Sequence, residues 1–200
     1  MQKNMKKKEL IRQAVHLVAG IIGVINIRYS IIPIGYVLLI YAAVIVLFIF
    51  LNLVVDDPLK IHRIVRVFER KNGMIGQGVV TLFSAYIILH FASFFDDKAF
   101  YASLSSMLIV SVGDSASTFF GIFLGGQKLP YNSRKTINGL VGGIISSFLS
   151  VLIFINILPA LVTTSIAMFA ESLDLKILKF RLDDNLLIPT ISFILLYLVF

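Results

Sequence analysis

The chain has 200 residues, of which 58% are hydrophobic and only 14% are charged. Its mean hydropathy of +0.94 lies far above that of a soluble globular domain, so the composition predicts a single integral membrane domain over residues 1–200. The absence of cysteine excludes disulfides and thiolate metal sites. The net charge of +7 is explained by membrane topology, as argued below, and we expect no nucleic-acid partner.

Seven apolar stretches have the composition of membrane-spanning helices, each of which needs about 20 apolar residues including its flanks. They cover residues 14–27, 31–55, 79–95, 100–124, 137–157, 160–173 and 186–200. The first, sixth and seventh are short, and one further helical turn from Leu10 would lengthen the first. A tight turn is expected at 156–159. The expected fold is all-α, a polytopic membrane protein of about seven transmembrane helices.

The distribution of Lys and Arg predicts the orientation of these helices. With a cytoplasmic N-terminus, sixteen of the 18 cations fall on the cytoplasmic side, and the outer side keeps only Arg28 and Lys98. This is a strong positive-inside bias. The N-terminal lysines are not read as part of a signal peptide, because no small-residue cleavage site follows them.

Residues 58–72 are expected to form an amphipathic helix on the cytoplasmic surface of the membrane. Asp57 is suited to the N-cap and Pro58 to the first helical position. Apolar residues recur at helical spacing and the cations fill the other faces, with the apolar set being Ile61, Ile64, Val65 and Phe68. The alternative is a solvated charged loop.

Asp114 is the most informative residue, because it lies within an apolar run where a carboxylate requires a partner or a polar cavity. Small residues recur every four positions on its helix, and a second series follows on the next helix, starting at Gly139. Such series let two helices approach closely. For the glycines, packing alone is an equally good explanation.

Between these helices lies a basic loop over residues 125–136, with a glycine pair and then Lys128, Arg134 and Lys135 before Thr136. Cations at a helix start suit a polyphosphate, with a point charge from Lys and a forked contact from Arg. The glycine spacing is not that of a Walker A loop. A basic loop of this kind can also serve topology alone.

Carboxylates follow at the same side of the membrane: Glu171 ends an apolar run, and Asp183, Asp184 and Asn185 open the last one. Carboxylates opposite a cationic loop are what a magnesium–nucleotide site requires, since Mg²⁺ prefers a few carboxylates and phosphate oxygens. Asp184 and Asn185 also fit a plain helix N-cap.

These residues together resemble the CTP-dependent lipid kinases, the family of dolichol kinase, phytol kinase and the CTP-using diacylglycerol kinase. The resemblance rests on Gly113-Asp114 before a glycine-spaced helix and on Lys135-Thr136 before Gly139. Weaker similarities cover nearly the whole chain: Glu9, Arg12 and His16, then Glu69 with Gly73, and then Glu171 with Asp184-Asn185 and Pro189. Gln13 departs from the pattern, because a second basic residue is expected there.

The resemblance implies transfer of the γ-phosphate of CTP to a lipid alcohol, giving a lipid phosphate and CDP, with Mg²⁺ as cofactor. It implies catalytic roles for Asp114, Lys135, Glu171 and Asp184. It implies nucleotide contacts from Lys128, Arg134, Lys135, Thr136, Asn138, Gly139 and Asn185. Metal contacts, or orientation of the hydroxyl, are implied for Asp114, Glu171, Asp183 and Asp184. The sequence does not identify the general base, the lipid, or the oligomeric state.

Two other functions fit parts of the pattern. A phosphatidate cytidylyltransferase, which makes a CDP-lipid and releases pyrophosphate, also places a glycine-Asp helix before a Lys-Thr block. The order Arg181-Leu182-Asp183-Asp184 lacks the Asp-Arg-x-Asp signature of that family. A small transporter would also use a polar residue within a helix, but it predicts an internal repeat, which the sequence does not show.

Overall fold

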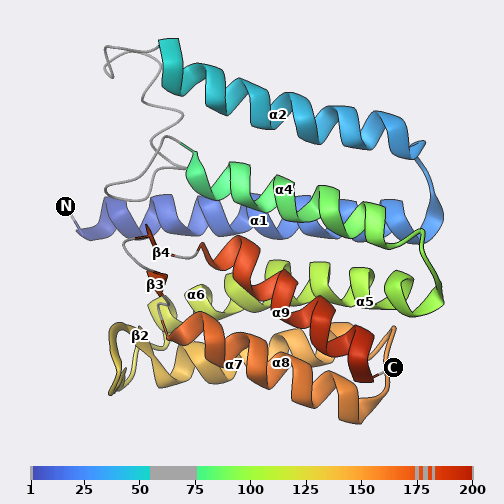
Figure 1. Ribbon diagram of the computed structural model, residues 1–200. Helices are drawn as coiled ribbons and strands as arrows, with labels where there is room; N and C mark the ends of the chain where they lie inside the picture. Colours follow the sequence, from blue (N-terminus) through green and yellow to red (C-terminus); the bar gives the residue numbers. More distant parts are fainter. Residues whose placement is uncertain (1, 55–75, 174–175, 178–179, 182, 200) are drawn as a thin grey trace.

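The computed structural model describes residues 2–54, 76–173, 176–177, 180–181 and 183–199. The amphipathic helix expected over 58–72 lies outside these residues. Among the described residues, seven helical rods run back and forth along one axis and pack side by side (Figure 1). The N-terminus and the C-terminus lie at opposite ends of the bundle.

Each expected membrane segment corresponds to one helical rod. The rods are α1 (Gln2–Tyr29), α2 (Ile34–Val54), α4 (Gln77–Ala92), a continuous rod of α5 (Asp97–Leu108), the π-helix η1 (Ile109–Gly113) and α6 (Asp114–Phe123), and then α7 (Ile137–Val151), α8 (Ile157–Ser172) and α9 (Asp184–Val199). Within the described ranges, three are long and apolar enough to cross a membrane: Lys8–Tyr29, Ile34–Leu53 and Asp97–Phe123. The other four are shorter apolar helices. The expected all-α membrane fold is confirmed.

Some boundaries differ from the expectation. The turn expected at 156–159 comes earlier, because α7 ends at Val151 and α8 already begins at Ile157. Pro159 thus lies in the first turn of α8, where the missing N–H costs no intrahelical bond. The basic loop contains a short antiparallel hairpin of β1 (Lys128–Leu129) and β2 (Asn132–Thr136), and a second hairpin pairs β3 (Lys176–Ile177) with β4 (Phe180–Arg181).

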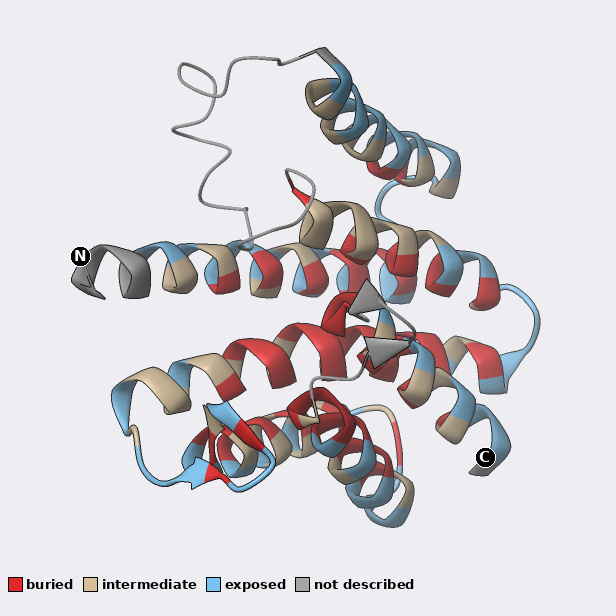
Figure 2. Ribbon diagram, turned by 60° about the vertical axis from the view of Figure 1, so that its left-hand side comes forward, coloured by how far each residue is buried: buried red, intermediate tan, exposed pale blue. Residues whose placement is uncertain are grey.

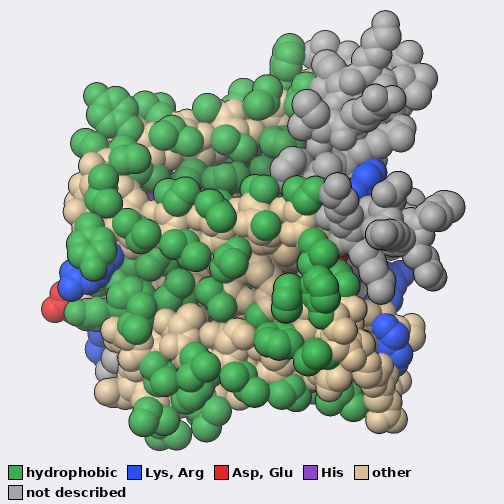
Figure 3. All heavy atoms as spheres, turned by 180° about the vertical axis from the view of Figure 1, so that it is seen from behind, with side chains coloured by type: hydrophobic (Ala, Val, Ile, Leu, Met, Phe, Trp, Pro, Cys, Tyr) green, Lys and Arg blue, Asp and Glu red, His purple; other side chains and the backbone are tan. Residues whose placement is uncertain are grey.

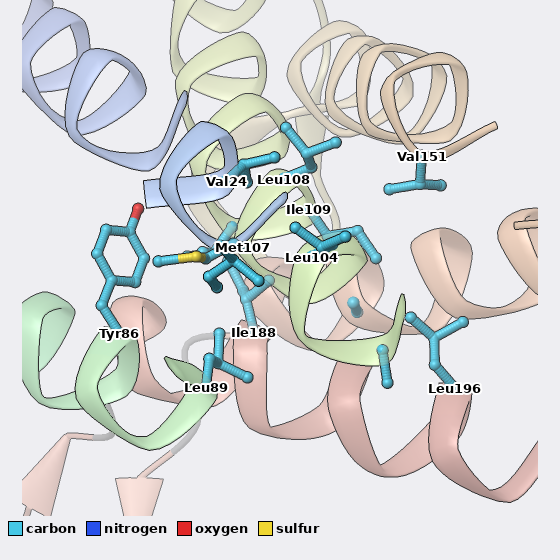
Figure 4. Close-up of a cluster of buried hydrophobic side chains, with 14 of the residues drawn as sticks. Val24, Tyr86, Leu89, Leu104, Met107, Leu108, Ile109, Val151, Ile188 and Leu196 are labelled. Atoms are coloured by element: carbon cyan, nitrogen blue, oxygen red, sulfur yellow. The ribbon is translucent and has the colours of Figure 1, made fainter. Parts of the chain in front are cut away.

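The apolar core lies around the rod of α5, η1 and α6, which is buried along most of its length (Figure 2). Leu104, Met107 and Ile109 are fully buried and pack with side chains from α1, α4 and α9 (Figure 4). By contrast, only 11% of the spanning segment of α2 is buried. Hydrophobic side chains cover the flank of the bundle, while Lys and Arg gather at its two ends (Figure 3). This distribution suits a protein surrounded by lipid.

The small-residue series on α6 and α7 form a close helix contact, as expected. A Cβ atom at Gly139 would lie 2.8 Å from the backbone oxygen of Ser117 and 3.4 Å from the Cα of Gly121. One turn further on, a Cβ at Gly143 would lie 3.1 Å from the backbone oxygen of Gly113. The contact therefore holds the start of α7 against the helix that begins with Asp114.

We predict that Gly139→Ala destabilises the protein, because the added methyl has no room against the α6 backbone. Overpacking of this kind costs about 1–3 kcal/mol. Gly35→Ala is the matched control, since no atom lies within 4 Å of the Cβ position at this helical glycine. Thermal unfolding in detergent measures the effect. Equal melting temperatures for Gly139→Ala and the wild type would contradict the close contact.

The bundle also allows a test of the predicted topology, with the N-terminus cytoplasmic and the C-terminus outside. Asp97 and Lys128 are exposed and lie at opposite ends of the bundle. Because the chain has no cysteine, Asp97→Cys and Lys128→Cys each provide a single thiol. An impermeant maleimide added to intact cells should label the first variant only. Labelling of both variants from outside would contradict the topology.

Candidate active site

Asp114 lies where η1 passes into α6, and its side chain is almost fully buried, with 3% of the residue exposed. Its carboxylate is met by side chains from α1. Gln13 Nε2 donates to Asp114 Oδ2 at 3.1 Å, and His16 Nδ1 lies 3.5 Å from the same oxygen. A buried carboxylate needs such partners, because water is not available to solvate it.

Gln13 is held in place by three further contacts to α6. Its Nε2 also donates to Thr118 Oγ1, and Ser115 Oγ donates to both the backbone oxygen and Oε1 of Gln13. A glutamine can donate and accept at once, whereas the basic residue expected at this position could only donate. Gln13, which departs from the family pattern, thus contacts Asp114 directly, and the sequence alone did not reveal this contact.

His16 presents a second polar atom next to Asp114. The residue is 6% exposed, and within the described part of the chain its Nε2 has no hydrogen-bond partner. A proton on Nδ1 points toward the Asp114 carboxylate, and Nε2 then carries a lone pair. Arg12 lies on the same face of α1 as His16, because both line the same cavity, and Arg12 forms an ion pair with Glu9.

This cavity has a volume of about 250 Å³ and is mostly apolar. Its polar lining consists of Arg12, His16, Asp114 and Asn185, so α1, α6 and α9 each contribute to one polar end. Asn185 also ties α9 to α4, since its Nδ2 donates to the backbone oxygen of Gly78 at 2.7 Å. The structure therefore places Asp114 and Asn185 in the lining of the same cavity.

A second charged cluster lies at the same end of the bundle. Lys135, near the end of β2, forms an ion pair with Glu171 Oε1 at the end of α8. Glu171 is 1% exposed, and its Oε2 has no hydrogen-bond partner among the described residues. A buried carboxylate with one oxygen unmet is suited to bind a further cation.

The hairpin that carries Lys135 is fixed to the bundle at both ends. Tyr131 Oη lies 2.9 Å from Ser172 Oγ, and Asn132 Nδ2 donates to the Ser172 backbone oxygen at 2.8 Å. At its far end Thr136 caps α7, because its Oγ1 accepts a bond from Gly139 N. Thr136 and Gly139, both expected to contact nucleotide, therefore have structural roles here as well.

The remaining expected residues are arranged around the hairpin. Lys128, Arg134 and Asn138 are exposed at its surface. Gly126 adopts a φ of 99°, which favours glycine, and a Cβ there would lie 2.5 Å from the Asn138 amide. The bend that leads from α6 into β1 thus depends on Gly126.

The four carboxylates expected to hold a metal do not converge on one point. In the described part of the chain, no three His, Asp or Glu residues are grouped closely enough to bind a metal ion. The cap of α9 is Asp183, whose Oδ1 accepts a bond from Asn185 N at 3.0 Å, and Asp184 begins the helix with 3% of its surface exposed. The sequence had offered Asp184-Asn185 as the cap.

A second cavity, of about 430 Å³, lies at the opposite end of the bundle and is lined by His90, Asp96 and Asp97 among others. His90 Nδ1 donates to the backbone oxygen of Tyr86, so the residue is a buried part of α4. Along the helices, the hydrogen bond between Tyr86 and Ser111 lies between the two cavities. This packed layer disfavours a continuous transport path.

We predict that Lys135→Met lowers the free energy of unfolding by about 3–5 kcal/mol, because it leaves the buried Glu171 carboxylate without its cation. Adding Glu171→Gln should restore most of that stability. Chemical denaturation in detergent measures both effects. If the double variant is stable, comparing its CTP affinity with that of Glu171→Gln alone, by calorimetry, isolates the phosphate-binding role of Lys135. Wild-type affinity in the double variant would show that Lys135 serves only to fix the hairpin.

Comparison with known proteins gives one match. The model of the cytidylyltransferase family matches residues 1–198. No curated protein and no solved structure gives a significant match. The match covers both charged clusters and supports an enzyme that acts on CTP and a lipid. The chain belongs to the cytidylyltransferase family.

Proposed function

We propose that the protein transfers the γ-phosphate of CTP to the hydroxyl group of a membrane lipid alcohol, giving a lipid phosphate and CDP. The observation that carries this proposal is the buried His16 side chain, which lines an apolar cavity and whose Nε2 has no hydrogen-bond partner in the described part of the chain. With the proton on Nδ1, which faces Asp114, Nε2 carries a lone pair. An alcohol donates a hydrogen bond to such a lone pair, whereas the oxygens of an ionised phosphatidate only accept and are repelled by it.

The nucleotide is assigned to the hairpin. Lys128 and Arg134 are exposed on the hairpin that connects the end of α6 to the start of α7. Arg offers a planar fork for phosphate oxygens and Lys a point charge, and Lys135 lies directly before the cap of α7. These groups neutralise a triphosphate without contributing any covalent chemistry, which is what phosphoryl transfer requires of a protein.

Magnesium fits this arrangement as an ion that arrives with the nucleotide. Mg²⁺ commonly takes only one or two carboxylates and completes its shell with phosphate oxygens and water. Glu171 fits best, because its buried Oε2 has no hydrogen-bond partner in the described ranges, and Asp183 and Asp184 are further candidates. When bound, the ion neutralises charge on the β- and γ-phosphates.

Asp114 is assigned to the acceptor. Gln13 and His16 both contact Oδ2 of Asp114, so the carboxylate orients the His16 side chain. In the proposed reaction the lipid oxygen forms a bond to the γ-phosphorus while the bond to the bridging oxygen breaks. CDP leaves with that electron pair, and His16 Nε2 takes the proton of the attacking hydroxyl.

Cytidylyl transfer to a phosphatidate is the second candidate, and the family match itself favours it. It uses the same nucleotide and the same cationic hairpin, but attack falls on the α-phosphorus and pyrophosphate leaves. In that reaction the attacking phosphate oxygen is already ionised, so an acceptor such as His16 Nε2 has no hydroxyl to meet.

We predict that purified protein transfers label from γ-³²P-CTP to a lipid alcohol in a panel of polyprenol, phytol and diacylglycerol, with CDP as the other product on thin-layer chromatography. Asp114→Asn should lower turnover about a hundredfold or more, because it removes a buried electrostatic group. Asp97→Asn, an exposed carboxylate at the other end of the bundle, is the control. Release of pyrophosphate, or more than about a tenth of the activity in Asp114→Asn, would contradict the assignment.

A further inference from the structure

We propose that the acceptor lipid enters the cavity sideways from the bilayer, between α1 and the pair formed by α2 and α4, and that only the part of its tail next to the hydroxyl is enclosed. This inference rests on the proposed function for the nature of the head group. It adds where the tail lies, how it enters, and which part of it the protein contacts.

The cavity lies where α1 and the α2–α4 pair face each other. α1 packs against α5, η1 and α6, whereas α2 packs against α4. The apolar lining comes from both sides of the gap and consists of Val15 and Ala19 on α1, Val44 and Phe48 on α2, and Val79, Leu82 and Phe83 on α4. An apolar tail is the ligand that such a lining fits, because no polar group along it requires a partner.

The inner end of the cavity is closed by close packing. A Cβ at Gly20 would overlap Ser111 Oγ, which is itself 2.7 Å from Tyr86 Oη. Tyr41 and Phe83 pack with ring centroids 5.1 Å apart at the same level. A tail therefore cannot continue along the axis of the bundle past the position of Ala19.

The side of the cavity that faces α2 opens toward lipid. Val15 lines the cavity and is 47% exposed, and the spanning segment of α2 is 11% buried, so the described residues leave this side of both helices largely uncovered. From Arg12 to Ala19 the cavity follows α1 for about 10 Å, at about 1.5 Å per residue. A longer tail leaves sideways into the bilayer. The protein therefore contacts the head group and the first part of the tail, and it does not select for tail length.

The polar end fixes the direction of the lipid in the cavity. Arg12, His16, Asp114 and Asn185 make up the polar part of the lining, and the apolar residues from α1, α2 and α4 make up the rest. His16 is more than nine-tenths buried and its Nε2 has no partner in the described part of the chain, so a hydroxyl at the cavity end would satisfy it. Nucleotide and lipid therefore approach the same point from different phases.

The test uses the full-length protein in nanodiscs without CTP, with a farnesol analogue that carries a diazirine on its second isoprene unit. After photolysis, mass spectrometry should map the label to α1, α2 and α4 residues of the cavity. Val15→Phe and Val44→Phe should reduce this label about tenfold, because a pocket that loses room for one or two methylene groups loses about that much affinity. They should raise the KM for farnesol similarly and leave the KM for CTP unchanged.

Matched controls keep the test independent of folding. Val18→Phe and Val46→Phe make the same change on the same two helices, at positions that are 55% and 63% exposed and do not line the cavity. They should label like the wild type. Equal labelling of Val15→Phe and Val18→Phe would overturn the inference, as would equal suppression of the label by dioleoylphosphatidylcholine and by unlabelled farnesol. Suppression by dioleoylphosphatidate but not by farnesol would support the cavity and contradict the kinase reaction.

Discussion

The structure depends on the cost of holding the Asp114 carboxylate inside a membrane. An anion in an apolar helix needs hydrogen-bond donors, and here the donors come from α1, about a hundred residues away in sequence. This requirement places Gln13 and His16 against the start of α6 and so fixes how α1 packs on the rod of α5, η1 and α6. The same contact aligns the polar end of the cavity with the Asp114 side chain.

A second constraint positions the cationic β1–β2 hairpin beside α6. The small residues of α6 and α7 bring two helix backbones together, so the residues before Gly139 lie next to the helix that Asp114 begins. The ion pair of Lys135 with buried Glu171 then locks the hairpin onto α8. The close packing of α6 on α7 and the ion pair of Lys135 with Glu171 together position the groups that the proposed reaction uses.

The sequence predicted the features that come from lipid solvation. Hydropathy identified all the helical rods that the structure describes, because each rod must be apolar over most of its length. The cost of a membrane carboxylate identified Asp114. The partners of Asp114 could not be predicted, because Gln13 is an unremarkable residue until α1 is placed against α6. The β1–β2 hairpin could not be predicted either, since its short strands carry no long alternating pattern. The cavity could not be predicted because it depends on how α1 is placed relative to α2 and α4.

In the proposed reaction, a lipid hydroxyl at His16 meets the terminal phosphate of a nucleotide bound at the hairpin. An experimental structure in a nanodisc with farnesol and the β,γ-imido analogue of CTP tests this arrangement. We expect the farnesol oxygen to lie within hydrogen-bond distance of His16 Nε2, with the γ-phosphorus as the nearest phosphorus to that oxygen. An α-phosphorus nearest to the lipid would mean cytidylyl transfer, and a nucleotide bound away from Arg134 and Lys135 would contradict the site itself.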